Sequence, residues 1–436
     1  MDIKKLLDSI SVGISAVPLP DHDCNNGVLL RLFSPANESD MEKALENALS
    51  SGFSVYSENE IEHNRYVTLT KEKTFLHIYF IPSEKKLRLI ADGFTLPFPK
   101  DKTDVARKAP VTLWMFETDH TYIDCGMCFV IRCADNSFFL IDSGHFLQLN
   151  DHKRLYRFLR ERTPDGEKIV INGWFITHAH DDHVCKCIDF IAEKHSDVSV
   201  EAFYYNTVCP RGKYSEYWGE ENIVYMEAFD DAAEKSGIPI VKLHSGQRLY
   251  IRGLTIDVLC THEDVYPKSL EDYNNSSTVL MIEAEGCRIC IPGDAGDRED
   301  ECLMNRFGEK TLRCDVMQLA HHGHFGLSSG FYKAANAKIV LVPNTQVIFE
   351  KDLSSIEASR VALSLSDSHH IASNGTVEVP IPYSPDTVRV LPDETFENFD
   401  RIKALWGYEY TDEKKQELFE GFLKRSGLPD FKDIKP

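Results

Sequence analysis

The stretch Trp174–His183, WFITHAHDDH, constrains this chain more than any other part of its sequence. The residues before it, from Lys168 to Thr177, are dominated by Ile, Val, Trp and Phe, which is typical of a buried strand. Four metal-capable side chains follow directly: His178, His180, Asp182 and His183. The pattern therefore predicts a layered fold in which a buried strand carries a metal-binding cluster to the edge of a sheet.

The spacing of these four side chains indicates how they can converge. In an extended chain His178 and His180 point to the same face, because side chains alternate along a strand. Asp182 and His183 then follow in a turn and can hold a second ion nearby. Imidazoles and a carboxylate suit zinc, manganese or iron better than calcium. The alternative of ordinary polar loop residues is disfavoured, because composition alone rarely places so many ligands after an apolar strand. We therefore expect one or two divalent metal ions, with zinc as the first choice.

Length and charge narrow the class of protein. A chain of 436 residues favours two or more domains, and a formal net charge of −21 disfavours binding to long nucleic acid. We find no apolar run long enough for a bilayer and no signal-peptide pattern, so we expect a cytoplasmic protein that acts on a small molecule and not at a membrane. The 12 Cys include two CxxC pairs, Cys125/Cys128 and Cys287/Cys290, which we expect to be reduced structural thiols.

Three regions differ in pattern. Residues 1–105 combine a helix at Glu38–Ser50 with several short strands, which predicts a small α+β accessory domain. Residues 111–385 alternate strand pairs with helices, which predicts a layered α/β domain. Residues 396–436 are expected to form a helical tail, which either packs on its own domain or covers the active site or a partner surface.

Three further strand ends carry polar residues. Asp294 lies in a GDAG turn, where the glycines let a carboxylate approach an ion closely. His321 and His322 follow the strand Asp315–Leu319, and at least one of them is expected to bind metal. Asp142 ends a strand at an IDSG turn, where we expect it to hydrogen-bond and orient a ligand.

These pieces resemble the metallo-β-lactamase superfamily, in which HAHDDH is preceded by IDSG and followed by PGD and HHG. NNSSTVL, IPGDAG and HHGHFG are most similar to the branch of DNA-uptake-protein hydrolase domains and choline-phosphate esterases. The resemblance covers residues 111–385 and implies an α/β, four-layer αββα sandwich. The ligand set that it implies is His178 and His180 for a first ion, Asp182 and His183 for a second, Asp294 as the bridge, and His321 as the last ligand, with His322 as its alternative.

The chain departs from the family pattern in one respect. The family commonly supplies another first-ion histidine between the motif and the bridging aspartate. Only His195, His244 and His262 lie in that interval here. We therefore expect His244, His262 or a water molecule to complete the first site, and one of the two ions to be held weakly.

The expected function is a metal-dependent hydrolase that uses a metal-activated water, with a phosphodiester as the favoured substrate. Asp182 is expected to orient the water, and His324, His369 or His370 to protonate the leaving group. A thioesterase or lactonase is the alternative on the same site, and a non-catalytic metal-binding or sensor protein is the alternative of another class. A flavin-linked diiron oxidoreductase is disfavoured, since that branch carries Glu in place of a cluster histidine. We expect the loop Cys209–Glu220 to contribute to substrate specificity.

Overall fold

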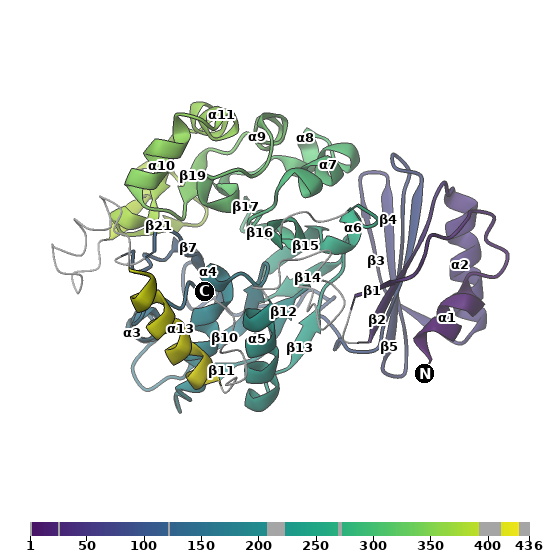
Figure 1. Cartoon of the computed structure of the whole chain (residues 1–436), viewed down its shortest axis with the longest axis horizontal. Coiled ribbons are helices and arrows are strands. Elements are labelled where there is room, and N and C mark those ends of the chain that lie inside the picture. Colours follow the sequence, from purple (N-terminus) through teal and green to yellow (C-terminus); the bar gives the residue numbers. More distant parts are fainter. Residues whose placement is uncertain are drawn as a thin grey trace.

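A computed structural model describes residues 2–24, 27–120, 123–206, 223–268, 273–391 and 411–426. These residues form three sheets, one in the N-terminal unit and two in the rest of the chain (Figure 1). None of the helices described is long and apolar enough to cross a membrane. The predicted loop Cys209–Glu220 and residues 396–410 and 427–436 of the predicted tail lie outside the described residues.

The N-terminal unit is a six-stranded antiparallel sheet with two helices on one face. Helix α2 begins at Glu38 because Asn37 and Asp40 form a capping box, in which each side chain accepts the backbone N–H of the other residue. The predicted helix at Glu38–Ser50 is confirmed. The elements are α1 (Ile3–Ile10), β1 (His22–Asp23), β2 (Val28–Phe33), α2 (Glu38–Ser50), β3 (Ser54–Ile61), β4 (Asn64–Lys71), β5 (Thr74–Ile81) and β6 (Lys86–Asp92), with the sheet order β1-β2-β6-β5-β4-β3.

The second sheet contains the motif strand. It has nine strands in the order β13-β12-β10-β9-β8-β7-β21-β22, with β11 paired to β10. Neighbours from β9 to β13 run parallel, and helices pack on the outer face of this sheet. The strands are β7 (Thr112–Met115), β8 (Cys128–Arg132), β9 (Phe138–Asp142), β10 (Ile169–Ile176), β11 (Val198–Val200), β12 (Phe203–Tyr205), β13 (Ile240–Lys242), β21 (Thr376–Pro380) and β22 (Arg389–Leu391). The helices are α3 (Asp151–Glu161), α4 (Asp181–Ala192), α5 (Ile223–Ser236) and α13 (Asp412–Ser426).

The third sheet has seven strands, in the order β14-β15-β16-β17-β18-β19-β20. The strands are β14 (Arg248–Ile251), β15 (Leu254–Cys260), β16 (Val279–Ala284), β17 (Cys287–Ile291), β18 (Val316–Gln318), β19 (Ile339–Val342) and β20 (Ser368–Ile371). The helices are α6 (His262–Val265), α7 (Asp297–Arg306), α8 (Glu309–Leu312), α9 (Ser329–Ala335), α10 (Gln346–Leu353) and α11 (Glu357–Leu365). Short 3₁₀ turns are η2 (Tyr273–Ser276), η3 (Ala320–Gly323), η4 (Ala372–Asn374) and η5 (Pro385–Thr387).

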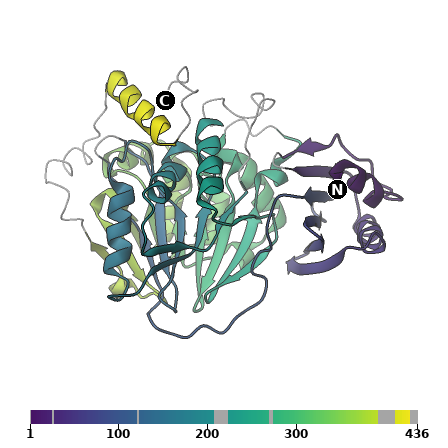
Figure 2. The same cartoon turned by 90° about the horizontal axis from the view of Figure 1, so that it is seen from below.

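The two larger sheets pack face to face. Phe129, Ile141 and Phe175 of the nine-stranded sheet share one buried cluster with Leu280 and Ile289 of the seven-stranded sheet. Helices cover both outer faces. The result is a four-layer αββα sandwich, so the predicted fold class is confirmed, and the N-terminal unit lies beside it (Figure 2).

The N-terminal sheet shares a core with the sandwich. Its second face places Tyr66, Tyr79 and Ile90 in the same buried cluster as Leu259 and other residues of the seven-stranded half. At Gly246 an added Cβ would lie 1.9 Å from the Tyr66 ring, and the residue has a φ of +78°. Glycine is therefore required there, because the two units approach too closely for any side chain.

A buried histidine at this interface predicts a pH-dependent stability. His244 lies 2.9 Å from Glu263 Oε1 and 3.2 Å from Asp92 Oδ2. Burial would lower its pKa, but Glu263 and Asp92 outweigh burial and raise the pKa to about 9. Because the folded pKa exceeds the unfolded value of about 6.5, this stabilisation is complete below pH 6.5 and is lost as pH rises through about 9.

We expect the free energy of unfolding to fall by up to about 3 kcal/mol between pH 6.5 and 9. Urea titrations at several pH values measure it. In Glu263→Gln the slope should shrink, since His244 loses one of its two carboxylate partners. A wild-type profile that is flat over this range would contradict the assignment.

Candidate metal centre

The motif leads from the end of β10 at Ile176 through four connecting residues into helix α4. The helix begins at Asp181 with His180 as its N-cap, whereas the sequence pattern predicts a turn at Asp182 and His183. Acidic side chains in a first turn are stabilised by the partial positive charge of the helix N-terminus, which favours the earlier start. Asp182 and His183 are therefore held by a helix rather than by a loop.

Four buried side chains meet at this edge: Asp182, His183, Asp294 and His322. We call them the four-residue group. His322 Nε2 lies 2.9 Å from Asp182 Oδ2 and 3.3 Å from Asp294 Oδ2. His183 Nε2 lies 3.3 Å from Asp294 Oδ2 and 3.2 Å from His322 Nε2. Their potential ligand atoms are thus close enough to share one ion.

A second set, the three-residue group, consists of His178, His180 and the same Asp294. His178 Nε2 lies 3.0 Å from His180 Nδ1 and 3.9 Å from Asp294 Oδ2. His178 is buried and His180 is half-buried. The structure thus brings five of the six predicted ligands together, with Asp294 common to both groups as the resemblance implied.

The sixth predicted ligand, His321, lies at the margin of the two groups, and His322 occupies the ligand position expected for it. Both residues have a left-handed backbone, with φ of 50° and 54°, which turns successive side chains in different directions. His322 Nδ1 lies 2.8 Å from the Pro343 carbonyl oxygen, so its Nε2 faces the group. His321 Nδ1 lies 2.6 Å from the Phe325 carbonyl oxygen, and its Nε2 is 4.0 Å from Asp294 Oδ2.

Asp142 supports the ligands from behind, which is the position that the sequence predicted. Its Oδ2 lies 2.7 Å from His183 Nδ1, so His183 presents Nε2 to the group. Thr177 donates its backbone N–H and its hydroxyl to the Asp142 carboxylate at 2.8 and 2.7 Å, and Thr177 Oγ1 lies 3.2 Å from His178 Nδ1. Sequence reasoning missed Thr177, although a polar residue at the end of an apolar strand was a usable signal.

Replacement of Asp142 by alanine is expected to weaken metal binding by about 10- to 100-fold, because His183 loses the partner that fixes its ring. Titration of the metal-free protein with Zn²⁺ measures the change. Asp135→Ala, in the turn before β9, is the control and should bind as the wild type does. Unchanged affinity in Asp142→Ala would show that the ring is held by other contacts.

The donor set fits divalent metal ions. Asp294 Oδ1 is buried and has no hydrogen-bond partner among the described residues. The facing ring nitrogens of His183 and His322 also leave room for a shared cation. Burial would lower the pKa of His322, but Asp294 and Asp182 outweigh it and raise this pKa to about 10. The group thus attracts positive charge, and its imidazole and carboxylate ligands suit zinc, manganese or iron.

Neither His244 nor His262 reaches the ligand groups. His244 lies between Asp92 and Glu263 at the interface with the N-terminal unit. His262 Nε2 lies 3.1 Å from Asn206 Oδ1 and is buried. The expectation that one of them completes the first site is therefore not met, because both are held by other polar side chains.

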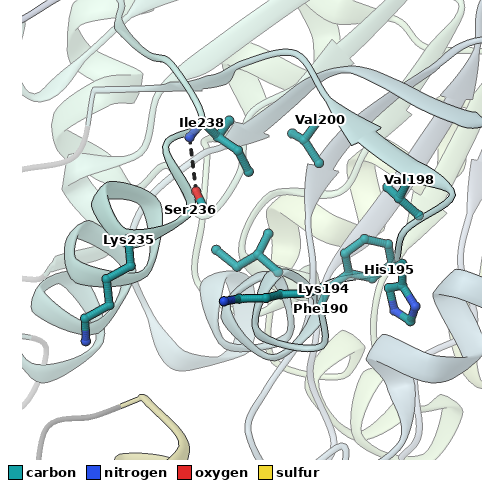
Figure 3. Close-up of a pocket in the computed structure, with 9 residues that line it drawn as sticks. Phe190, Lys194, His195, Val198, Val200, Lys235, Ser236 and Ile238 are labelled. Atoms are coloured by element: carbon teal, nitrogen blue, oxygen red, sulfur yellow. Dashed lines mark hydrogen bonds between the residues drawn. The ribbon is translucent and has the colours of Figure 1, made fainter.

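The third histidine of that interval, His195, was not expected to bind metal, and it lies beyond the far end of α4. Its ring stacks on Tyr156 at 4.0 Å between centroids. It lines a pocket of about 410 Å³ together with the ends of α4 and α5 (Figure 3). Twelve helical residues span about 18 Å, and the metal ligands of α4 are in its first turn. This pocket is therefore separate from the metal centre.

The three predicted proton donors fall in two places. His324 is near the site: its ring is 5.6 Å from that of His321, and its Nδ1 pairs with Asp352. His369 and His370 lie on β20 and line another pocket, of about 320 Å³. Of these three, His324 has a neighbour in the ligand groups: its ring lies 6.4 Å from that of His322 between centroids.

A further set of contacts around Asp181 was not foreseen. The Leu147 N–H donates to His145 Nδ1 at 2.9 Å, so His145 carries its proton on Nε2 and donates it to Asp181 Oδ2, also at 2.9 Å. Burial, together with the charge of the same carboxylate, raises the pKa of the Tyr225 hydroxyl well above its usual value. The histidine directly after IDSG was the signal in the sequence. These contacts fix the N-terminus of α4, which carries Asp182 and His183.

No protein-family model matches the chain, and no curated protein sequence is similar to it. Several solved structures, however, are similar to the chain. The metallo-β-lactamase fold protein YhfI from Bacillus subtilis matches with 12% identity over 60% of this chain and 96% of that chain, at a TM-score of 0.39. Unliganded yeast PDE1 matches with 13% identity over 60% and 97%, at a TM-score of 0.36. CmlA, a diiron β-hydroxylase from Streptomyces venezuelae, matches with 13% identity over 59% of this chain and 49% of that chain, at a TM-score of 0.34. At these identities the likeness concerns the fold.

Proposed function

We propose that this protein is a metal-dependent hydrolase that cleaves a phosphodiester in a small-molecule substrate. The observation that supports this most is the pair of ligand groups that share Asp294 at one edge of the sandwich. Two adjacent ion sites suit in-line displacement at phosphorus, where charge develops on both the attacking and the leaving oxygen. A thioesterase or lactonase on the same residues is the alternative. Zinc is the favoured ion, ahead of manganese and iron.

Divalent ions held by these residues would act as Lewis acids and lower the pKa of a coordinated water. The chain itself positions the ligands. Asp142 and Thr177 fix His183 and His178 from behind. Asp182, whose side chain is 9% exposed, would accept a hydrogen bond from the attacking water. His324, paired with Asp352, is the nearest of the predicted proton donors for a leaving group.

Replacement of Asp182 by asparagine is expected to lower hydrolysis by at least about 100-fold, because the variant loses a carboxylate that binds the ion and orients the water. The fold should persist, since asparagine has the same shape. Steady-state kinetics and thermal unfolding on the same preparation measure the two effects. Activity close to that of the wild type would exclude the proposed role of Asp182.

A panel of chromogenic substrates tests the reaction class. We expect bis(4-nitrophenyl) phosphate to give a higher kcat/KM than a thioester, a lactone or a cephalosporin. Treatment with a chelator should abolish turnover, and added Zn²⁺ should restore it. Elemental analysis on the same sample separates the alternatives: bound metal without turnover of any substrate would favour a non-catalytic metal-binding protein.

A further inference from the structure

The two ligand groups differ in number and charge of donors. The four-residue group offers two carboxylates and two imidazoles, all buried. The three-residue group offers one carboxylate, which it shares, and two imidazoles, of which His180 is half-buried. Each carboxylate both ligates an ion and neutralises its charge. The four-residue group is therefore the stronger binder on composition alone.

The groups also differ in the contacts that hold their ligands in place. In the four-residue group, His183 Nδ1 is 2.7 Å from the Asp142 carboxylate, and His322 Nδ1 is 2.8 Å from the Pro343 carbonyl oxygen. Both rings thus present Nε2 without rearrangement. Such outer contacts raise metal affinity by about 10- to 100-fold.

The three-residue group has less support. The Thr177 hydroxyl oxygen lies 3.2 Å from His178 Nδ1, which is longer than the 2.7 and 2.8 Å contacts in the four-residue group. Among the described residues, His180 Nε2 has no hydrogen-bond partner, and its ring has Tyr273 as an aromatic neighbour at 5.1 Å. His195, His244 and His262 are held elsewhere, so none of them adds a fourth ligand. An ion here keeps open positions that water or substrate must fill.

We propose that the two groups bind metal with unequal affinity: the four-residue group retains its ion, and the three-residue group exchanges its ion with the surroundings. This rests on the proposed metal-dependent function and adds a regulation to it. The fraction of protein that holds two ions is then set by the free metal concentration. The structure also assigns the tighter binding to the four-residue group, a choice that the sequence left open.

Metal content measures this directly. The protein is loaded with excess Zn²⁺, passed through a desalting column and submitted to elemental analysis. We expect about one ion per chain to remain. Calorimetric titration should then show a second ion that binds about 10- to 100-fold more weakly than the first. His178→Ala should keep the retained ion and lose the weak one, whereas His322→Ala should lose the retained ion.

His369→Ala, on β20 and away from both groups, is the matched control and should bind two ions as the wild type does. If His322→Ala fails to fold, Asp182→Asn reports on the same group with little change of shape. Two ions retained by the wild type, or a retained ion that is lost in His178→Ala, would overturn the proposal. None of these readouts requires turnover. One tight and one weak ion without phosphodiester hydrolysis would reject the proposed function and leave this inference standing.

Discussion

Replacement of Asp294 by alanine is expected to remove both ions at once and to lower turnover by at least about 1,000-fold. Asp294 is the one carboxylate that belongs to both ligand groups. Without it, His183 Nε2 and His322 Nε2, which each lie 3.3 Å from its Oδ2, lose their shared anionic partner. Bound metal supplies several kcal/mol of transition-state stabilisation, and each 1.36 kcal/mol is a factor of ten in rate.

Elemental analysis and steady-state kinetics on one preparation test this expectation. Asp297→Ala is the matched control, because Asp297 is an exposed carboxylate in the first turn of α7, three residues further along. It should leave metal content and rate unchanged. An Asp294→Ala protein that keeps one ion per chain would show that the two groups do not depend on a common bridge.

Replacement of Arg306 by alanine is expected to destabilise the whole protein by about 3–5 kcal/mol. Arg306 lies on α7 with its side chain fully buried, 2.7 Å from Asp264 Oδ1, and it also donates to Glu84 of the N-terminal unit. Asp264 in turn accepts a hydrogen bond from the Tyr79 hydroxyl at 2.7 Å. Loss of the guanidinium removes the ion-pair partner of the buried Asp264 carboxylate and leaves Glu84 with Lys86 and Arg88 as its remaining cations. Removing one member of a buried pair is strongly destabilising, because the other charge stays buried.

Urea denaturation measures this loss. Arg65, whose ion pairs with Glu58 and Glu42 are largely exposed, provides the control: Arg65→Ala should cost no more than about 1 kcal/mol. Since the N-terminal sheet and the sandwich share a core, we expect a single unfolding transition in both variants. Separate transitions for the two units, with Arg306→Ala affecting one of them, would contradict this coupling.

Much of the architecture could be predicted because the local patterns agree with the final fold. The continuous apolar run before the motif and the apolar stripe of the helix at Glu38–Ser50 are both clear in the sequence. The clustering of the motif with Asp294 was implied by the family resemblance, whose pieces each lie at a strand end. The sheet topology brings those ends to one edge.

The remaining details depend on tertiary contacts that local patterns do not contain. The choice between His321 and His322 rests on two left-handed residues and on the Pro343 carbonyl, far along the chain. The N-terminal region reads as a separate unit in sequence because its strands alternate like those of any small sheet. Its second apolar face is buried only through contacts with Leu259 and its neighbours in the sandwich.

Helix α13 bears on how this site comes into being during synthesis. Phe419 and Phe422 are buried against Phe146 and Tyr225, and α13 contacts α4 and α5. Phe146 adjoins His145, which holds Asp181 at the start of the motif helix. A growing chain in which every proposed ligand residue has already left the ribosome still lacks the packing of α13 against α4 and α5. Chains grow from the N-terminus, so we expect the apolar packing around Phe146 and Tyr225 to be completed only after α13 has left the ribosome.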